Sequence, residues 1–227
     1  MGQVDLIVGD CRKVLSNMNE KSFHLVIADP PYRIRSWNGF GASGDKNYDG
    51  DPPPEYSEWL PDCFRVLKDN GSIFVFENPI NIKALWDAME AAGFIVSWTL
   101  VWWVTFRKSH PARGFYNAHF EPILCGVKTR EWMFDRAPLK GRGSETGGDV
   151  FAAAAQVSNA IVPGQKPYDL IERLIKVHTK VGDSVLDPFA GSCVTLRAAK
   201  DLSRFCTGIE VNEALARQAI KYRHMED

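Results

Sequence analysis

A short polar turn, Asp29-Pro30-Pro31-Tyr32, directly follows the apolar run Leu25–Ala28. Two successive prolines remove two backbone donors, so the carbonyl group of Pro30 has no place in a strand ladder. This carbonyl and the Asp29 carboxylate are two hydrogen-bond acceptors at a strand tip, and the Tyr32 ring can stack on a planar group. The combination suits an exocyclic amine on a nucleobase. The alternative is an ordinary proline-rich turn with a surface tyrosine.

A second turn, Asp187-Pro188-Phe189-Ala190-Gly191-Ser192, follows the apolar run Ser184–Leu186, and Glu210 ends the next run, Phe205–Ile209. A strand that turns through small residues into a helix lets a ligand approach the backbone, and a carboxylate about twenty residues on can bind both hydroxyls of a ribose. Because this turn has the single Gly191 and not the GxGxxG pattern, a cofactor with a ribose but no pyrophosphate, such as S-adenosylmethionine, fits better than a dinucleotide. The alternative is an ordinary βαβ turn capped by Ser192.

The elements that must position these turns alternate between strand and helix. Apolar runs predict buried strands at Asp5–Val8, Phe23–Ala28, Ser72–Phe76, Phe94–Thr105, His119–Val127, Ser184–Leu186 and Phe205–Ile209. Periodic apolar residues predict helices over 55–67, 81–92, 170–178 and 211–222. This pattern predicts an α/β fold, a mostly parallel sheet with helices on both faces and an antiparallel hairpin, 94–127, at one edge. Ligands of such sheets bind beyond the carboxyl ends of the strands, where both turns lie.

The 227 residues suffice for one substantial core, and we interpret 1–227 as a single domain. Two stretches lack a regular pattern: 33–54 is expected to be a mobile loop beside the site, and 129–163 a small insertion. The longest apolar run is too short to span a bilayer, and no signal peptide is visible. Five scattered cysteines without a CxxC pair indicate neither a zinc site nor a disulfide framework, and we expect a reducing cytoplasm.

Taken in order, the motifs resemble those of the amino-group DNA methyltransferases of the permuted beta arrangement, which methylate adenine N6 or cytosine N4. That family has an early D-P-P-Y catalytic motif, matched by 29–32, and a late D-P-F-x-G-S-G cofactor motif, matched by 187–193. Gly9-Asp10 matches its first strand end, Gln165-Lys166-Pro167 its Q-K-P element, and Glu210 its acidic strand tip. The resemblance extends from Leu6 to about Tyr222 and implies a Rossmann-like methyltransferase fold.

The resemblance also implies a role for each matched residue. Asp29, Pro30, Pro31 and Tyr32 form the catalytic motif: Asp29 and Pro30 orient the target amine, and Tyr32 stacks on a base flipped out of the duplex. The implied cofactor is S-adenosyl-L-methionine, with no metal, and methyl transfer is a direct displacement. The implied cofactor-binding residues are Asp10, Cys11, Asp29, Lys166, Pro167, Asp187, Phe189, Ala190, Gly191, Ser192 and Glu210. Among them, Glu210 holds the ribose, Asp10 and Cys11 lie at the adenine, and Lys166 and Pro167 lie near the methionine end.

The charge distribution points to a DNA-binding region. The chain has 27 basic and 28 acidic residues, which excludes a wholly basic DNA-binding protein. Between Thr105 and Arg142, however, eight Lys or Arg stand against three Asp or Glu. A solvated hairpin face is the alternative to phosphate contact here. The predicted DNA-binding residues are Arg33, Arg35, Arg107, Lys108, Arg113, Lys140 and Arg142, with Trp37 and Phe40 as candidates to fill the gap left by a flipped base.

The expected substrate is adenine N6 in duplex DNA, because Asp at position 29 is the form that the family associates with adenine. Insertion 129–163 is then a small target-recognition element. Cys193 and Val162 depart from the family's usual Gly and His. Open alternatives are a cytosine-N4 enzyme, an RNA or protein-glutamine methyltransferase, and a catalytically silent DNA-binding relative. The resemblance also leaves open a homodimer, a partner restriction nuclease and association with the nucleoid.

Overall fold

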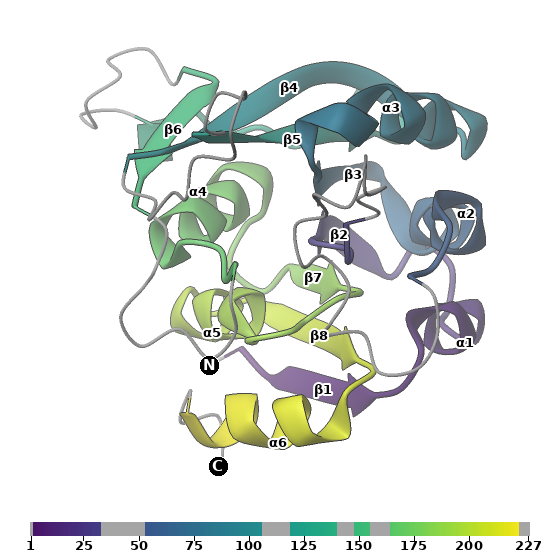
Figure 1. Ribbon diagram of the computed structural model, residues 1–227, viewed down its shortest axis with the longest axis vertical. Coiled ribbons are helices and arrows are strands. Elements are labelled where there is room, and N and C mark those ends of the chain that lie inside the picture. The colour runs from purple at the N-terminus through teal and green to yellow at the C-terminus, as the bar shows by residue number, and fades with distance from the viewer. Residues whose placement is uncertain (1, 33–52, 106–118, 140–147, 155–163, 223–227) are drawn as a thin grey trace, which may run out of the picture.

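The computed structural model describes residues 2–32, 53–105, 119–139, 148–154 and 164–222. Within these ranges, eight strands form one sheet in the order β1-β8-β7-β2-β3-β5-β4-β6 (Figure 1). The strands are β1 (Val4–Val8), β2 (Phe23–Ala28), β3 (Leu67–Phe76), β4 (Ile95–Val104), β5 (Phe120–Val127), β6 (Val150–Ala153), β7 (Ser184–Asp187) and β8 (Phe205–Glu210). The α-helices are α1 (Cys11–Ser16), α2 (Tyr56–Val66), α3 (Ile82–Ala91), α4 (Tyr168–His178), α5 (Val194–Asp201) and α6 (Glu213–Tyr222).

Most of the sheet is parallel. Strands β1, β8, β7, β2 and β3 pair in parallel, β5 runs antiparallel to both β3 and β4, and β6 pairs in parallel with β4. The predicted fold class is therefore confirmed. The predicted hairpin is present as β4 and β5, but β6 lies outside it and forms the edge of the sheet.

Helices cover both faces of the sheet (Figure 1). On one face, α1, α2 and α3 share a buried apolar cluster with Val26 and Ala28 of β2. On the other face, α4, α5 and α6 share a second cluster with Leu25 and Ile27 of the same strand. Because successive residues of a strand point to opposite faces, a strand buried on both sides needs an uninterrupted apolar run, which β2 has from Leu25 to Ala28.

The chain changes direction across the sheet between β2 and β7. From β2 the chain continues to β3 on one side, whereas from β7 it continues to β8 on the other side. The two central strands pair in parallel, with Leu25 opposite Val185 and Val26 opposite Leu186. The turns that follow them therefore leave the sheet at the same edge, which is where open α/β sheets bind ligands.

Some elements differ from those predicted. The short helices α1 and α5 and the four-residue strand β6 were not predicted, and β3 starts at Leu67 rather than Ser72. Short elements have too few residues to show a hydrophobic periodicity, so their conformation depends on contacts with the rest of the fold. Strand β6 lies within the predicted insertion 129–163, and the remaining described part of that insertion contains a 3₁₀ turn at Ala137–Leu139. Nearly all of the predicted loop 33–54 lies outside the described residues.

None of the helices in the described ranges is both long and apolar enough to cross a membrane.

Trp59 of α2 couples the core to the turn after β7. Its side chain is fully buried, and its ring meets Phe189 edge to face, with centroids 5.1 Å apart and planes at 85°. Its Nε1 has no hydrogen-bond partner among the described residues. We predict that Trp59→Ala lowers the free energy of unfolding by about 3–5 kcal/mol, because it opens a large cavity.

Urea denaturation measures this effect, with Trp59→Phe as the matched control. Phenylalanine keeps a buried aromatic ring and removes the unpartnered N–H. The free energy of unfolding should therefore fall clearly less in Trp59→Phe than in Trp59→Ala. Equal losses for the two variants would contradict the packing role.

Candidate functional site

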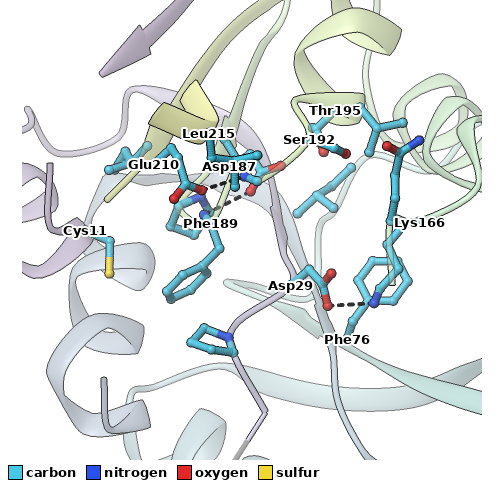
Figure 2. A pocket seen from close by; sticks show the side chains of 18 of the residues that line it. Cys11, Asp29, Phe76, Lys166, Asp187, Phe189, Ser192, Thr195, Glu210 and Leu215 are labelled. Carbon is cyan, nitrogen blue, oxygen red and sulfur yellow. Dashed lines mark hydrogen bonds and ion pairs between the residues drawn. The ribbon is translucent and has the colours of Figure 1, made fainter. Parts of the chain in front are cut away.

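A cavity of about 200 Å³ opens at the carboxyl ends of β2, β7 and β8. Figure 2 shows that its labelled side chains gather at two ends. Cys11, Phe189 and Glu210 lie toward one end, and Asp29, Phe76 and Lys166 lie toward the other. Both sequence motifs thus contribute to a single cavity.

The turn between β7 and α5 is tied to the end of β8. The Ala190 N–H donates to the Ile209 carbonyl at 2.8 Å, and the Gly191 N–H donates to Glu210 Oε2 at 2.8 Å. Glu210 Oε1 accepts a further bond from the Asn212 N–H at 2.8 Å. Burial raises the pKa of the Glu210 carboxyl, and these backbone bonds oppose the rise. Each carboxylate oxygen can still accept another hydrogen bond, so Glu210 can bind a ligand hydroxyl.

Asp187 holds the start of this turn. Its Oδ1 accepts a bond from the Phe189 N–H at 3.0 Å, and its side chain also bonds to Thr195. Burial raises the pKa of Asp187 to about 7, which is far above the ordinary aspartate value. Asp187 is therefore a structural support for the turn whose charge varies near neutral pH.

Cys193 has a left-handed backbone conformation, with a φ of +58°, directly before α5. Glycine adopts this conformation at little cost, whereas a residue with a Cβ is strained there. This explains why glycine is usual at this position of the motif, and it shows that the turn keeps its shape with cysteine. The thiol is fully buried.

At the opposite end of the cavity, Asp29 takes part in a compact ionic cluster. Its Oδ1 lies 2.8 Å from Lys166 Nζ and accepts a bond from the Tyr32 hydroxyl at 3.0 Å. Lys166 Nζ also donates to the Tyr32 hydroxyl at 3.0 Å. No described residue bonds to Asp29 Oδ2, and the side chain keeps 33% of its surface exposed. Asp29 is thus anchored by one oxygen and offers the other to the cavity.

The sequence analysis missed Glu121, which completes this cluster. The side chain lies on β5, is nearly buried, and its Oε2 is 3.1 Å from Lys166 Nζ and 3.2 Å from the Tyr32 hydroxyl. An acidic residue at the start of an apolar strand was a signal in the sequence. In the charge count, Glu121 is only one of the three acidic residues between Thr105 and Arg142.

Other predicted site residues lie nearby with different roles. Cys11 lines the cavity, but the Asp10 side chain caps α1 and pairs with Arg12. The bonds from Arg12 lower the pKa of Asp10. Pro31 lines the cavity, whereas Pro30 is buried beside it and Pro167 directly precedes α4. Lys166 points its amine at Asp29, on the side away from Glu210 (Figure 2).

The predicted DNA-binding residues cannot be placed. Arg33, Arg35, Arg107, Lys108, Arg113, Lys140 and Arg142 all lie outside the described residues, as do Trp37, Phe40 and Val162.

The sheet order, the cavity at the strand ends and the acidic tip of β8 define a Rossmann-like methyltransferase fold. The chain belongs to the N6/N4 DNA methylase family, whose sequence model, described as DNA methylase, matches residues 23–221.

Two curated relatives are similar over most of this chain. The type II methyltransferase M.HpaI of Haemophilus parainfluenzae is 30% identical over 225 residues, covering 92% of this chain and 70% of its own length. M.BglII of Bacillus subtilis is 31% identical over 244 residues, covering 90% of this chain and 64% of its own length. The chain thus spans about two thirds of the length of these relatives.

Solved structures share the fold over nearly the whole chain. The complex of M1.HpyAVI with SAM has a TM-score of 0.72 at 25% identity and covers 96% of this chain and 99% of its own. The PvuII DNA methyltransferase, which is cytosine-N4-specific, has a TM-score of 0.77 at 20% identity. The match covers 100% of this chain and 88% of the PvuII chain. The predicted N6/N4 DNA methylase family is therefore confirmed, whereas the permuted beta arrangement stays a prediction. The predicted cofactor agrees with the SAM of the M1.HpyAVI complex.

The raised pKa of Asp187 predicts a pH-dependent stability. Between its ordinary value near 4 and its folded value of about 7, the folded protein binds more protons than the unfolded chain. The contribution of Asp187 to the free energy of unfolding therefore falls as the pH rises through this window. Asn does not titrate and its carbonyl oxygen can accept the same bonds, so Asp187→Asn should reduce the loss of stability between pH 5 and pH 8.

Urea denaturation at both pH values checks this, and pH 5 is the internal control, because folded Asp187 is mostly protonated there. If the free energy of unfolding changes between pH 5 and pH 8 by the same amount in Asp187→Asn and in the unmodified protein, Asp187 is not the titrating group.

Proposed function

We propose that this DNA methylase transfers a methyl group from S-adenosyl-L-methionine to the exocyclic N6 of adenine in a short duplex sequence, after the base has been flipped out of the helix. The observation that supports this most is the single cavity with a ribose-type carboxylate, Glu210, toward one end and the Asp29 carboxylate toward the other. Glu210 would hold the cofactor toward one end of this cavity, and Asp29 would receive the target base at the other.

The described residues fit this cofactor. Glu210 keeps acceptor capacity for ribose hydroxyls beside the Gly191 backbone, and Phe189 and Leu215 supply apolar surface next to it. Cys11 lines the same end, where the adenine is expected. When bound, the cofactor supplies a methyl group on a positively charged sulfonium, which is a good leaving group. The remaining contribution of the protein is positioning and electrostatic stabilisation.

Asp29 and Pro30 act on the target amine. Asp29 Oδ2 and the Pro30 carbonyl would accept hydrogen bonds from its two N–H groups and so orient the lone pair of the nitrogen for methyl transfer. Positive charge develops on this nitrogen during transfer, and a nearby carboxylate stabilises it. Burial raises the pKa of Asp29, and the Lys166 ammonium opposes the rise without cancelling it. Asp29 must be ionised to accept these bonds, so activity is expected to fall on acidification at a pH above the ordinary aspartate range.

Adenine is preferred over cytosine because position 29 is Asp. Cytosine N4 is the alternative, since the family includes enzymes of both kinds and the PvuII enzyme with this fold is cytosine-N4-specific. The early position of the catalytic motif argues against an RNA or protein-glutamine enzyme, and the ordered geometry of Asp29, Tyr32 and Glu210 argues against a silent relative.

Several finer features belong to the same proposal. Residues 1–227 act as one catalytic domain, with 33–54 as an active-site loop and 129–163 as a target-recognition element. The basic residues of the segment 105–142 and of the loop contact the duplex. The protein works beside a restriction nuclease, at the nucleoid in the cytoplasm, and its similarity to two type II methyltransferases supports this part of the proposal.

Methyl transfer can be tested directly. Purified protein is incubated with methyl-labelled S-adenosyl-L-methionine and duplex DNA of mixed sequence, and the DNA is digested to nucleosides. We expect label in N6-methyladenine. Label in N4-methylcytosine would overturn the choice of base, and an unlabelled digest would overturn the reaction. Asp29→Ala is the inactive control, which should still bind the cofactor through Glu210.

The cofactor site can be tested without DNA. We predict that Glu210→Gln weakens S-adenosyl-L-methionine binding at least tenfold, because bonds to a charged acceptor contribute about 1.5–3 kcal/mol. Isothermal titration calorimetry measures the Kd. Glu213→Gln is the matched control, because Glu213 is exposed and pairs with Arg217 on the outer surface of α6. An unchanged Kd for Glu210→Gln would remove Glu210 from the ribose site.

A further inference from the structure

Glu121 is a carboxylate of the active site to which the proposed mechanism gives no role. It comes from β5, whereas Asp29 follows β2 and Lys166 directly precedes Pro167 and α4. Glu121 is only 7% exposed, so its charge must be compensated inside the protein. Its Oε2 lies 3.1 Å from Lys166 Nζ and 3.2 Å from the Tyr32 hydroxyl.

Lys166 is held in a fixed position by this cluster. An ammonium group has three N–H donors, and three acceptors lie within reach: Asp29 Oδ1 at 2.8 Å, the Tyr32 hydroxyl at 3.0 Å and Glu121 Oε2 at 3.1 Å. Three aromatic rings surround the amine, with centroids at 5.1 Å (Phe76), 5.2 Å (Tyr32) and 5.9 Å (Trp102). The side chain is 6% exposed, so water does not screen the ammonium.

Asp29, Glu121 and Lys166 together carry a formal charge of −1, because two carboxylates share one ammonium. If Lys166 were paired with Asp29 alone, the sum would be zero, and the ammonium would oppose the positive charge that develops on the target nitrogen. Glu121 prevents this because it takes a share of the same ammonium.

We propose that Glu121 is a positioning residue for Asp29: by sharing Lys166, it holds the ammonium on the Oδ1 side and prevents it from neutralising Asp29, so that Oδ2 stays available to the target amine. The catalytic consequence rests on the proposed function, whereas the effect of Glu121 on the charge of Asp29 does not. Tyr32 fixes the geometry, because its hydroxyl accepts from Lys166 and lies within donating distance of both carboxylates.

The charged groups that face Asp29 come from several elements. Lys166 and the hydrogen bond from Tyr32 favour its ionised form, and the neighbouring carboxylates oppose ionisation. These groups are Lys166, Tyr32 from the turn itself, Glu121 from β5, Glu77 after β3 and Asp187 at the end of β7. Removing the negative charge of Glu121 should therefore lower the pKa of Asp29, and removing the positive charge of Lys166 should raise it.

The first experiment reads the charge of Asp29 without any substrate. The full-length protein is labelled with ¹³C at the aspartate carboxyl carbons, and the Asp29 signal is assigned by its loss in Asp29→Asn. We expect a lower titration midpoint in Glu121→Gln, a higher one in Lys166→Met, and an intermediate one in the double variant. A midpoint that is the same in Glu121→Gln and the unmodified protein would overturn the proposal.

The second experiment reads the catalytic consequence. The label-transfer rate of Glu121→Gln should fall at least tenfold, with an acid limb moved to lower pH and an unchanged Kd for S-adenosyl-L-methionine. The double variant Glu121→Gln/Lys166→Met restores a sum of −1 and should transfer faster than Glu121→Gln alone. If Glu121 only supported packing, the two losses would add and the acid limb would stay in place.

The two proposals fail in different ways. If the unmodified protein labels no nucleoside, the proposed function is wrong, and the carboxyl titration still decides whether Glu121 sets the charge of Asp29. If the unmodified protein is active but Glu121→Gln retains its full rate and its pH profile, the role of Glu121 is wrong and the proposed function stands.

Discussion

The parallel pairing of β2 with β7 is the constraint on which the site depends. These two strands come from opposite ends of the chain, yet Leu25 lies opposite Val185 and Val26 opposite Leu186. The pairing places the turns after the strands at the same edge, so that Asp29 and Asp187 line one cavity. A shift of one residue would point the buried side chains of β2 to the opposite faces of the sheet and change the direction of both turns.

The second constraint is electrostatic. Burial raises the pKa values of Asp29, Glu77, Asp187 and Glu210, which gather at the ends of four neighbouring strands. Such carboxylates repel one another and need donors. Backbone N–H groups supply them at Glu77, Asp187 and Glu210, and Lys166 supplies them at Asp29. An edge with this many carboxyl groups is suited to a positively charged ligand, because such a ligand favours their ionised forms, and a sulfonium is one.

The parts of this arrangement that could be predicted from the sequence are those with local signals. The long apolar run of β2 and the turns at 29–32 and 187–192 follow from residue type and spacing, because prolines, small residues and strand periodicity act over a few positions. Glu121 could not be placed in this way, since its partner Lys166 is brought to it only by the packing of α4 against the sheet. The four residues of β6 likewise form a strand only because they pair with β4.

The order of the motifs along the chain carries no chemistry of its own. Asp29 precedes Glu210 by most of the sequence, but the cavity requires only that β2, β7 and β8 be neighbours with parallel directions. A chain that visited these strands in another order would bring the same carboxylates to the same edge. Under the proposed function, activity would depend on strand adjacency and on the ionic cluster that holds Asp29, and not on motif order. That cluster joins segments from both sides of the switch point, because Glu121 comes from the β3 side and Lys166 directly precedes α4 and β7. The region where the chain reverses its direction across the sheet thus receives residues from several elements, which is a physical reason to expect the chemistry there.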